Sequence, residues 1–202
     1  MSAPALARSR KERPPRERRP AVPGASRLAM KLFLMSLAVL FLASLVAAVV
    51  VRGRAVAWPP GGAPALPRLL WLSTLLLVAC SVAVHLAVTA IRGGSQRRLL
   101  RWLGVTAGLG LAFLACQTFA WLAFYDPQRF GADLYGFTFF MLTGLHAAHV
   151  LGGLVALGVG IVLARRGAFT WAHYDGVRNV ALYWHFLDGV WLVLFGFLLA
   201  GF

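Results

Sequence analysis

The chain has 202 residues, of which 60% are hydrophobic and only 13% charged, and its mean hydropathy is +0.75. A soluble domain of this size does not need so much apolar surface, so the composition indicates a membrane protein and argues against a soluble enzyme. The net charge of +14 resembles that of a nucleic-acid-binding protein, but +7 of it falls within residues 1–31.

We interpret residues 1–28 as a disordered basic cytoplasmic tail, because arginines and prolines alternate there with few apolar side chains. A polybasic segment beside a hydrophobic span is typical of a membrane-surface or topology signal, and a nucleic-acid-binding arm is the less favoured alternative. The apolar run from Leu32 to Val51 is too long for the core of a signal peptide and is followed by Arg52. It therefore predicts an uncleaved first span.

Residues 29–202 are predicted to form one transmembrane domain with an all-α fold. Each of its hydrophobic segments can cross a hydrocarbon core of ~30 Å, and none shows the alternation of a membrane β-barrel strand. A loop rich in proline and glycine, from Trp58 to Pro64, cannot be helical and separates the first two segments. The predicted bundle has five helices, at about 29–51, 68–91, 99–124, 135–164 and 180–202.

The charges of the connecting segments predict the orientation of this multi-pass bundle. The tail and the loops 92–101 and 165–179 together carry +13, whereas the segments on the other side carry +2. The positive-inside rule then places the N-terminus in the cytoplasm and the C-terminus outside. We expect the membrane itself to be a bacterial inner membrane.

Small residues recur every four positions along the fourth span and form a ridge without bulky side chains. Such a ridge allows another helix to approach closely, since helix association in lipid depends on van der Waals packing. The third span has the same spacing at Gly104 and Gly108. The ridge consists of Gly144, Ala148, Gly152, Ala156 and Gly160.

Polar residues within the spans are the candidates for function, because an ionisable group at membrane depth is costly. His185 and Asp188 are three residues apart, so on a helix they share a face and can hydrogen-bond each other. Arg178 or a group on another helix are alternative partners for Asp188, which needs one in lipid. The full set is His85, His146, His149, His185, Asp188 and Gln117, with Trp184 and Trp191 on a common stripe of the last span.

Two facing histidines on different helices are also the ligands of a bis-histidine haem, so a small membrane haem protein is an alternative. We favour structural hydrogen bonding, because no basic cluster lies at membrane depth to hold haem propionates. Cys80 and Cys116 form no CxxC or metal-spaced pair and are predicted to be small packing residues.

Two long motifs resemble subunit III of the haem-copper terminal oxidases, cytochrome c oxidase polypeptide III, in its five-helix bacterial form. Residues 139–150, FFMLTGLHAAHV, resemble the family's F-F-x-x-T-G-F-H-G-x-H-V. Residues 183–192, YWHFLDGVWL, resemble Y-W-H-F-V-D-V-V-W-L. The resemblance runs from the first span to the C-terminus and leaves out the basic tail.

The resemblance implies a non-redox subunit that packs against the catalytic subunit I, in a complex that also contains subunit II. It implies no catalytic, cofactor or metal site in this chain, with haem and copper in the partners, phospholipid as a possible ligand, and support of proton uptake. The histidines would then be structural and Asp188 would anchor the last span. No contact with nucleic acid is expected.

Two departures from the family pattern remove carboxylates that it usually carries. Leu37 follows Ser36 where the family has a glutamate, and Ala120 replaces the glutamate of Q-x-x-E-Y. The two extra N-terminal helices of the seven-helix form have no counterpart in the spans. A subunit III-like accessory protein of nitric oxide reductase and a quinol oxidase subunit III are therefore alternatives. A transporter is a further alternative, of a different class.

Overall fold

The computed structural model describes residues 25–127 and 133–201, and this part of the chain is folded into helices joined by loops. Each helix is long and apolar enough to cross a membrane, which confirms the predicted spans. Residues 1–24 of the predicted tail lie outside the described part, and residues 25–28 belong to the first helix. The helices are α1 (Ala25–Arg54), α2 (Leu69–Arg92), α3 (Gln96–Phe124), α4 (Leu134–Arg165) and α5 (Asp175–Gly201).

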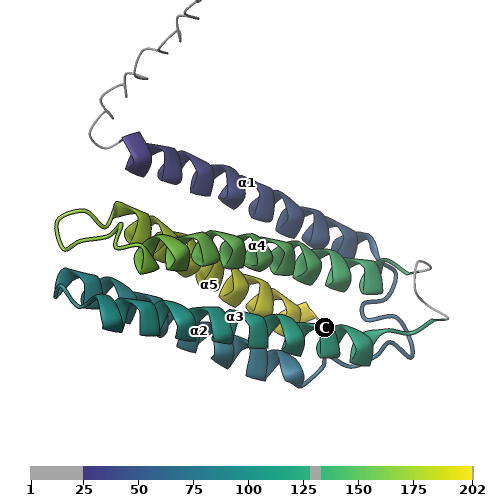
Figure 1. Cartoon of the computed structure of the whole chain (residues 1–202). Coiled ribbons are helices and arrows are strands. Elements are labelled where there is room, and N and C mark those ends of the chain that lie inside the picture. Colours follow the sequence, from purple (N-terminus) through teal and green to yellow (C-terminus); the bar gives the residue numbers. More distant parts are fainter. Residues whose placement is uncertain (1–24, 128–132, 202) are drawn as a thin grey trace, which may run out of the picture.

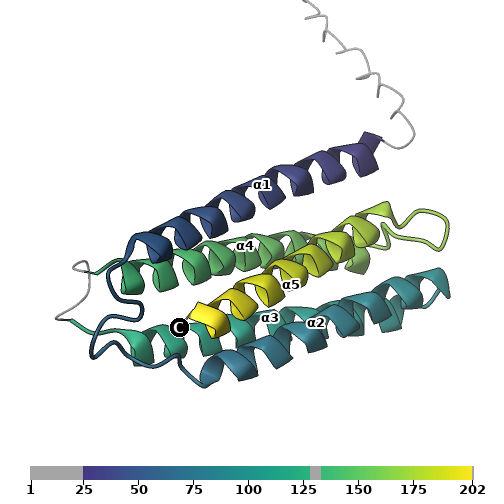
Figure 2. The same cartoon turned by 180° about the vertical axis from the view of Figure 1, so that it is seen from behind.

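The helices lie side by side in three layers, with α4 and α5 between α1 and the hairpin of α2 and α3 (Figures 1 and 2). Among the described helices, α1 contacts α4 and α5 but neither α2 nor α3. Only 17% of the most apolar stretch of α1 is buried within the chain, compared with 44% for α2 and α5. Most of the surface of α1 is therefore open to lipid or to another protein.

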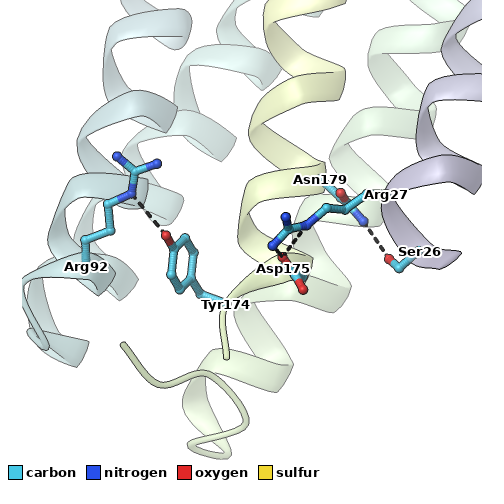
Figure 3. A network of polar contacts seen from close by, with 6 residues as sticks. All are labelled: Ser26, Arg27, Arg92, Tyr174, Asp175 and Asn179. Carbon is cyan, nitrogen blue, oxygen red and sulfur yellow. Dashed lines mark hydrogen bonds and ion pairs between the residues drawn. The ribbon is translucent and has the colours of Figure 1, made fainter. Parts of the chain in front are cut away.

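At the end of the bundle where α5 begins, polar contacts join α1 to α5 and α2 to the loop before α5 (Figure 3). The Arg27 guanidinium makes an ion pair of 2.8 Å with the Asp175 carboxylate, and Asn179 donates a hydrogen bond of 2.9 Å to Ser26. Arg92 donates to the Tyr174 hydroxyl at 3.2 Å. The start of α1 and the two basic loops thus lie at one end, the arrangement that the charge pattern requires.

The opposite end is closed by the loop between α1 and α2, which is not helical from Ala55 to Pro67, as predicted. The Trp58 indole donates a hydrogen bond of 2.5 Å to the carbonyl of Gly201 and packs edge-on against Tyr135. Asp133 caps α4 by accepting a hydrogen bond of 2.7 Å from the backbone N–H of Gly136. These contacts fix the ends of α4 and α5 relative to the loop.

Candidate functional site

Two fully buried tryptophans of α5 form the centre of the bundle. Trp191 donates a hydrogen bond of 2.9 Å from its indole to the Thr74 hydroxyl on α2, and its ring packs edge-on against Phe113 of α3. Trp184 lies against Gly110 of α3, where a side-chain methyl would come within 2.8 Å of its ring. The motif around Asp188 therefore joins α5 to both helices of the α2–α3 hairpin.

His146 of α4 is completely buried in a box of aromatic rings. The centroids of Trp191, Phe113 and Phe41 lie 5.0, 5.7 and 6.2 Å from that of the imidazole. Neither ring nitrogen has a hydrogen-bond partner within residues 25–127 and 133–201. Because three helices supply the walls of the box, the imidazole acts here as a packing element.

His149, one turn further along α4, is partly buried and makes defined contacts. Its Nδ1 donates to the Leu145 carbonyl at 2.7 Å, and its ring lies 5.1 Å from that of Phe41. Its own carbonyl accepts a hydrogen bond of 2.8 Å from the Tyr183 hydroxyl of α5. The His146 ring thus packs against α1, α3 and α5. His149 packs against α1 with its ring and contacts α5 through its backbone carbonyl.

The hydrogen bond considered between His185 and Asp188 is not formed. His185 is exposed, and its Nδ1 lies 2.6 Å from the Ser81 hydroxyl of α2. Asp188 is only 7% exposed, and neither carboxylate oxygen has a hydrogen-bond partner of good geometry within the described residues. The hydrogen-bond partner of His185 is therefore the Ser81 hydroxyl and not Asp188. The same hydroxyl lies beside the Asp188 carboxyl.

Arg178 does not reach Asp188 either, since ten residues of helix separate them and correspond to about 15 Å along the axis. The remaining alternative, a group on another helix, agrees with the position of Ser81. On the same outward side, the His85 ring of α2 lies 6.3 Å from that of His185. Ser81, His85, His185 and Asp188 therefore form one cluster, which we call the α2–α5 polar cluster.

Gln117 of α3 is fully buried, and neither its amide oxygen nor its nitrogen has a hydrogen-bond partner among the described residues. One turn further on, the Trp121 indole donates a hydrogen bond of 2.9 Å to the Thr143 hydroxyl of α4. This bond and the aromatic contact between Phe113 and His146 hold α3 to α4 on either side of Gln117.

The predicted small-residue ridge is not covered by any of the described helices. A methyl at Gly144 or Gly160 would meet no atom within 4 Å, and Ala148, Gly152 and Ala156 are exposed. Gly104 and Gly108 of α3 are equally open. The tight contact of α4 is at Gly153, where a methyl would come within 2.9 Å of the Tyr183 ring. The predicted close approach of another helix to the ridge is therefore not made by the described helices and stays a prediction.

Sequence reasoning did not identify Thr74, Thr143 and Gly153, although each contacts a predicted residue or its motif. The signal for Gly153 was present but ambiguous, since Gly152 and Gly153 are neighbours and only one fits a four-residue repeat. The hydroxyls of Thr74 and Thr143 also donate hydrogen bonds within their own helices, to the carbonyls of Leu70 and Phe139. A threonine can always do this in a helix, so the sequence does not show that it also contacts another helix.

The described residues contain no group of three or more histidine, cysteine, aspartate or glutamate side chains placed to hold a metal ion. Cys80 and Cys116 are free and buried, with their sulfur atoms near the carbonyls of Thr106 and Leu69. The polar side chains of the bundle contact backbone carbonyls, hydroxyls and aromatic rings. This arrangement joins helices to one another.

The family model for cytochrome c oxidase subunit III matches residues 17–200. The chain belongs to the cytochrome c oxidase subunit III family. As a subunit III it is a membrane protein and part of an oxidoreductase complex with other oxidase subunits. The motifs that resembled this family contain the buried residues described above, His146 and Asp188 among them.

Curated subunit III proteins from several lineages are similar to this chain. The cytochrome c oxidase subunit 3 of a Synechocystis strain is 35% identical over 81% of this chain and 70% of its own length. That of Thermostichus vulcanus is 31% identical over 83% of each chain. The subunit 3 of Corynebacterium diphtheriae is 35% identical over 60% of each.

Proposed function

We propose that this chain is a non-redox structural subunit of a haem-copper cytochrome c oxidase of the bacterial inner membrane. It stabilises subunit I, which with subunit II carries the haem and copper that reduce oxygen to water, and it supports proton uptake by that complex. The observation that supports this proposal is the way its motif histidines are used. His146 is enclosed by aromatic rings, and the His149 ring bonds the Leu145 carbonyl and packs against Phe41 of α1, so both contribute to helix packing.

A haem held by His146 is disfavoured by the same contacts. His146 is 0% exposed, and the rings of Trp191, Phe113 and Phe41 surround its imidazole, which leaves no room for a porphyrin at the histidine nitrogens. We therefore propose no cofactor in this chain, and phospholipid as the ligand that its apolar outer surface would accept.

The proposed orientation has the N-terminus in the cytoplasm. The end that carries Arg27, Arg92 and Arg165 is the more basic end of the bundle, and positive loops are retained on the cytoplasmic side. An accessible cysteine placed in the 166–174 loop should react with a membrane-impermeant maleimide only in inside-out vesicles. Labelling of the same cysteine in intact cells would show that the orientation is the opposite one.

The role in the complex is tested by purification of the native assembly through an affinity tag on this chain. We expect oxidase subunits I and II among the companion chains and a haem spectrum that belongs to them. After dissociation in a harsher detergent, the isolated polypeptide should be colourless and free of stoichiometric iron and copper. Iron or copper bound to the polypeptide itself would overturn the proposal, as would a complex without any oxidase chain.

The same purification separates the accessory role in nitric oxide reductase from the role in an oxidase. The relatives are named as cytochrome c oxidase subunits, which favours the oxidase. Companion chains with the subunits of a nitric oxide reductase, together with nitric oxide consumption by the purified complex, would favour the alternative.

A further inference from the structure

The α2–α5 polar cluster lies at the level of the helix midpoints. Asp188 is the central residue of α5 and Ser81 is next to the centre of α2. His185 and His85 are three and four residues from these positions, which corresponds to about 5 to 6 Å along the helices. In a membrane-spanning bundle this depth is the middle of the hydrocarbon core.

Two members of the cluster are turned outward at this depth. His85 and His185 are both exposed on the surface of the chain. The Ser81 hydroxyl occupies Nδ1 of His185, which leaves Nε2 of that ring pointing away from the bond. No hydrogen bond to His85 is formed within residues 25–127 and 133–201. Imidazole groups in this position face the bundle interior or another protein much more often than lipid, because lipid tails offer no hydrogen bond.

The surface beside the cluster is hollowed and apolar. An apolar groove of about 380 Å³ runs between α1 and α5, with His185 in its wall and Phe41 and Val193 among its lining residues. Gly189 also lines the groove, and a methyl at Gly189 or at Gly196 would meet no atom within 4 Å. Because these glycines are seven residues apart, they expose the backbone on one side of α5 over two turns.

We propose that the α2–α5 polar cluster and the adjacent α1–α5 groove bind one transmembrane helix of a partner oxidase subunit. This helix presents a hydrogen-bonding side chain at mid-membrane depth to His185 and His85, and its apolar residues fill the groove over Gly189. The inference rests on the proposed function, since it names the face through which the subunit is held.

The contact is tested by a photo-crosslinking amino acid placed in the tagged full-length chain in native membranes. Val82, which is next to Ser81, is 56% exposed, and Leu111 at the middle of α3 is a matched control at 59%. We expect irradiation of the Val82 variant to give an adduct with an oxidase subunit, and the Leu111 variant to give at most a small fraction of that yield. Adducts of Val82 only with lipid or with a second copy of this chain would overturn the assignment.

The hydrogen-bonding role is tested by replacement of both outward histidines. We expect His85→Leu/His185→Leu to lower retention of the chain in the detergent-washed complex about tenfold, which corresponds to the loss of one or two membrane hydrogen bonds. His173→Leu, which removes an exposed histidine of the loop before α5, should retain the wild-type yield. Equal retention of the double variant and the loop variant would overturn the polar contact.

Failure of this inference differs from failure of the proposed function. If the unmodified tagged chain purifies with the oxidase while Val82 gives no protein adduct, the subunit role holds and the docking face is wrong. If the unmodified chain purifies without any oxidase subunit, the proposed function itself is rejected. Circular dichroism of the purified double-histidine variant checks that its helices are intact, as expected for substitutions of exposed residues.

Discussion

The indole ring of Trp184 lies directly against the backbone of Gly110, so that α3 and α5 touch where one residue has no side chain. A methyl at Gly110 would come within 2.8 Å of the Trp184 ring and within 3.0 Å of the Leu154 side chain. Trp184 is fully buried, so its ring is enclosed by other residues of the bundle. The glycine is therefore required by the tryptophan of the YWHFLDGVWL motif.

We expect Gly110→Ala to lower the stability of the purified chain in detergent by about 1 to 3 kcal/mol, the usual effect of overpacking. The matched control is Gly108→Ala, where the added methyl meets no atom within 4 Å. Its stability should be unchanged or slightly higher, because alanine favours helix more than glycine does. Thermal unfolding followed by circular dichroism compares the two, and equal melting temperatures would contradict the close contact.

The hydrogen bond from the Trp191 indole to the Thr74 hydroxyl predicts an energetic coupling between α5 and α2. The bond is 2.9 Å long and partly buried, and Thr74 also donates to the Leu70 carbonyl. Trp191→Phe and Thr74→Val should each destabilise the chain, and the double variant should be more stable than the sum predicts by about 1 kcal/mol. A double-mutant cycle measures this term, and strict additivity would show that the bond contributes nothing.

Substitution of His146 is expected to change the stability little, because its polar atoms have no hydrogen-bond partner among the described residues. Replacing an unpaired buried polar group by an apolar one of similar size costs little and can stabilise. We therefore expect His146→Leu to keep the stability of the chain within about 1 kcal/mol and to leave the haem spectrum of the complex intact. A loss of bound haem in this variant would instead identify His146 as a ligand.

The length and position of the helices could be predicted from the sequence, because hydropathy alone determines which segments can span a bilayer. The predicted start of the last span at residue 180 is five residues late, since α5 begins at Asp175. The buried side chain of Val177 extends the packed face into the predicted loop, whereas Asp175 and Arg178 make this first turn resemble a loop in composition. Tertiary packing decides that boundary.

The partners of the buried side chains could not be predicted in the same way. Spacing showed that His185 and Asp188 share one side of α5, but Ser81 on α2 is the residue that meets His185. The pairing of α2 with α5 depends on how the helices are arranged, and one sequence carries no pattern for it. The sequence also does not show which face of α4 contacts α5. Adjacent residues of a helix point about 100° apart, so Gly152 and Gly153 lie on different faces.

Alanine substitutions at Gly152 and Gly153 compare the two faces of α4 in a single experiment. A methyl at Gly153 would come within 2.9 Å of the Tyr183 ring, which is held in place by its hydrogen bond to the His149 carbonyl and by stacking on Phe33. We expect Gly153→Ala to lower the melting temperature of the purified chain, by an amount equivalent to about 1 to 3 kcal/mol.

Gly152→Ala is the matched variant on the ridge, since its methyl would be in ordinary contact at 3.8 Å from the Tyr183 hydroxyl. Its melting temperature should stay at the wild-type value. Gly152→Leu should also fold, because Gly152 is exposed and the Tyr183 hydroxyl is the one atom of the described residues that its methyl would approach. Any loss of this larger variant from the assembled complex then reports on an external neighbour. Normal assembly of Gly152→Leu would mean that the ridge faces lipid, and a destabilised Gly152→Ala would contradict the assignment of the two faces.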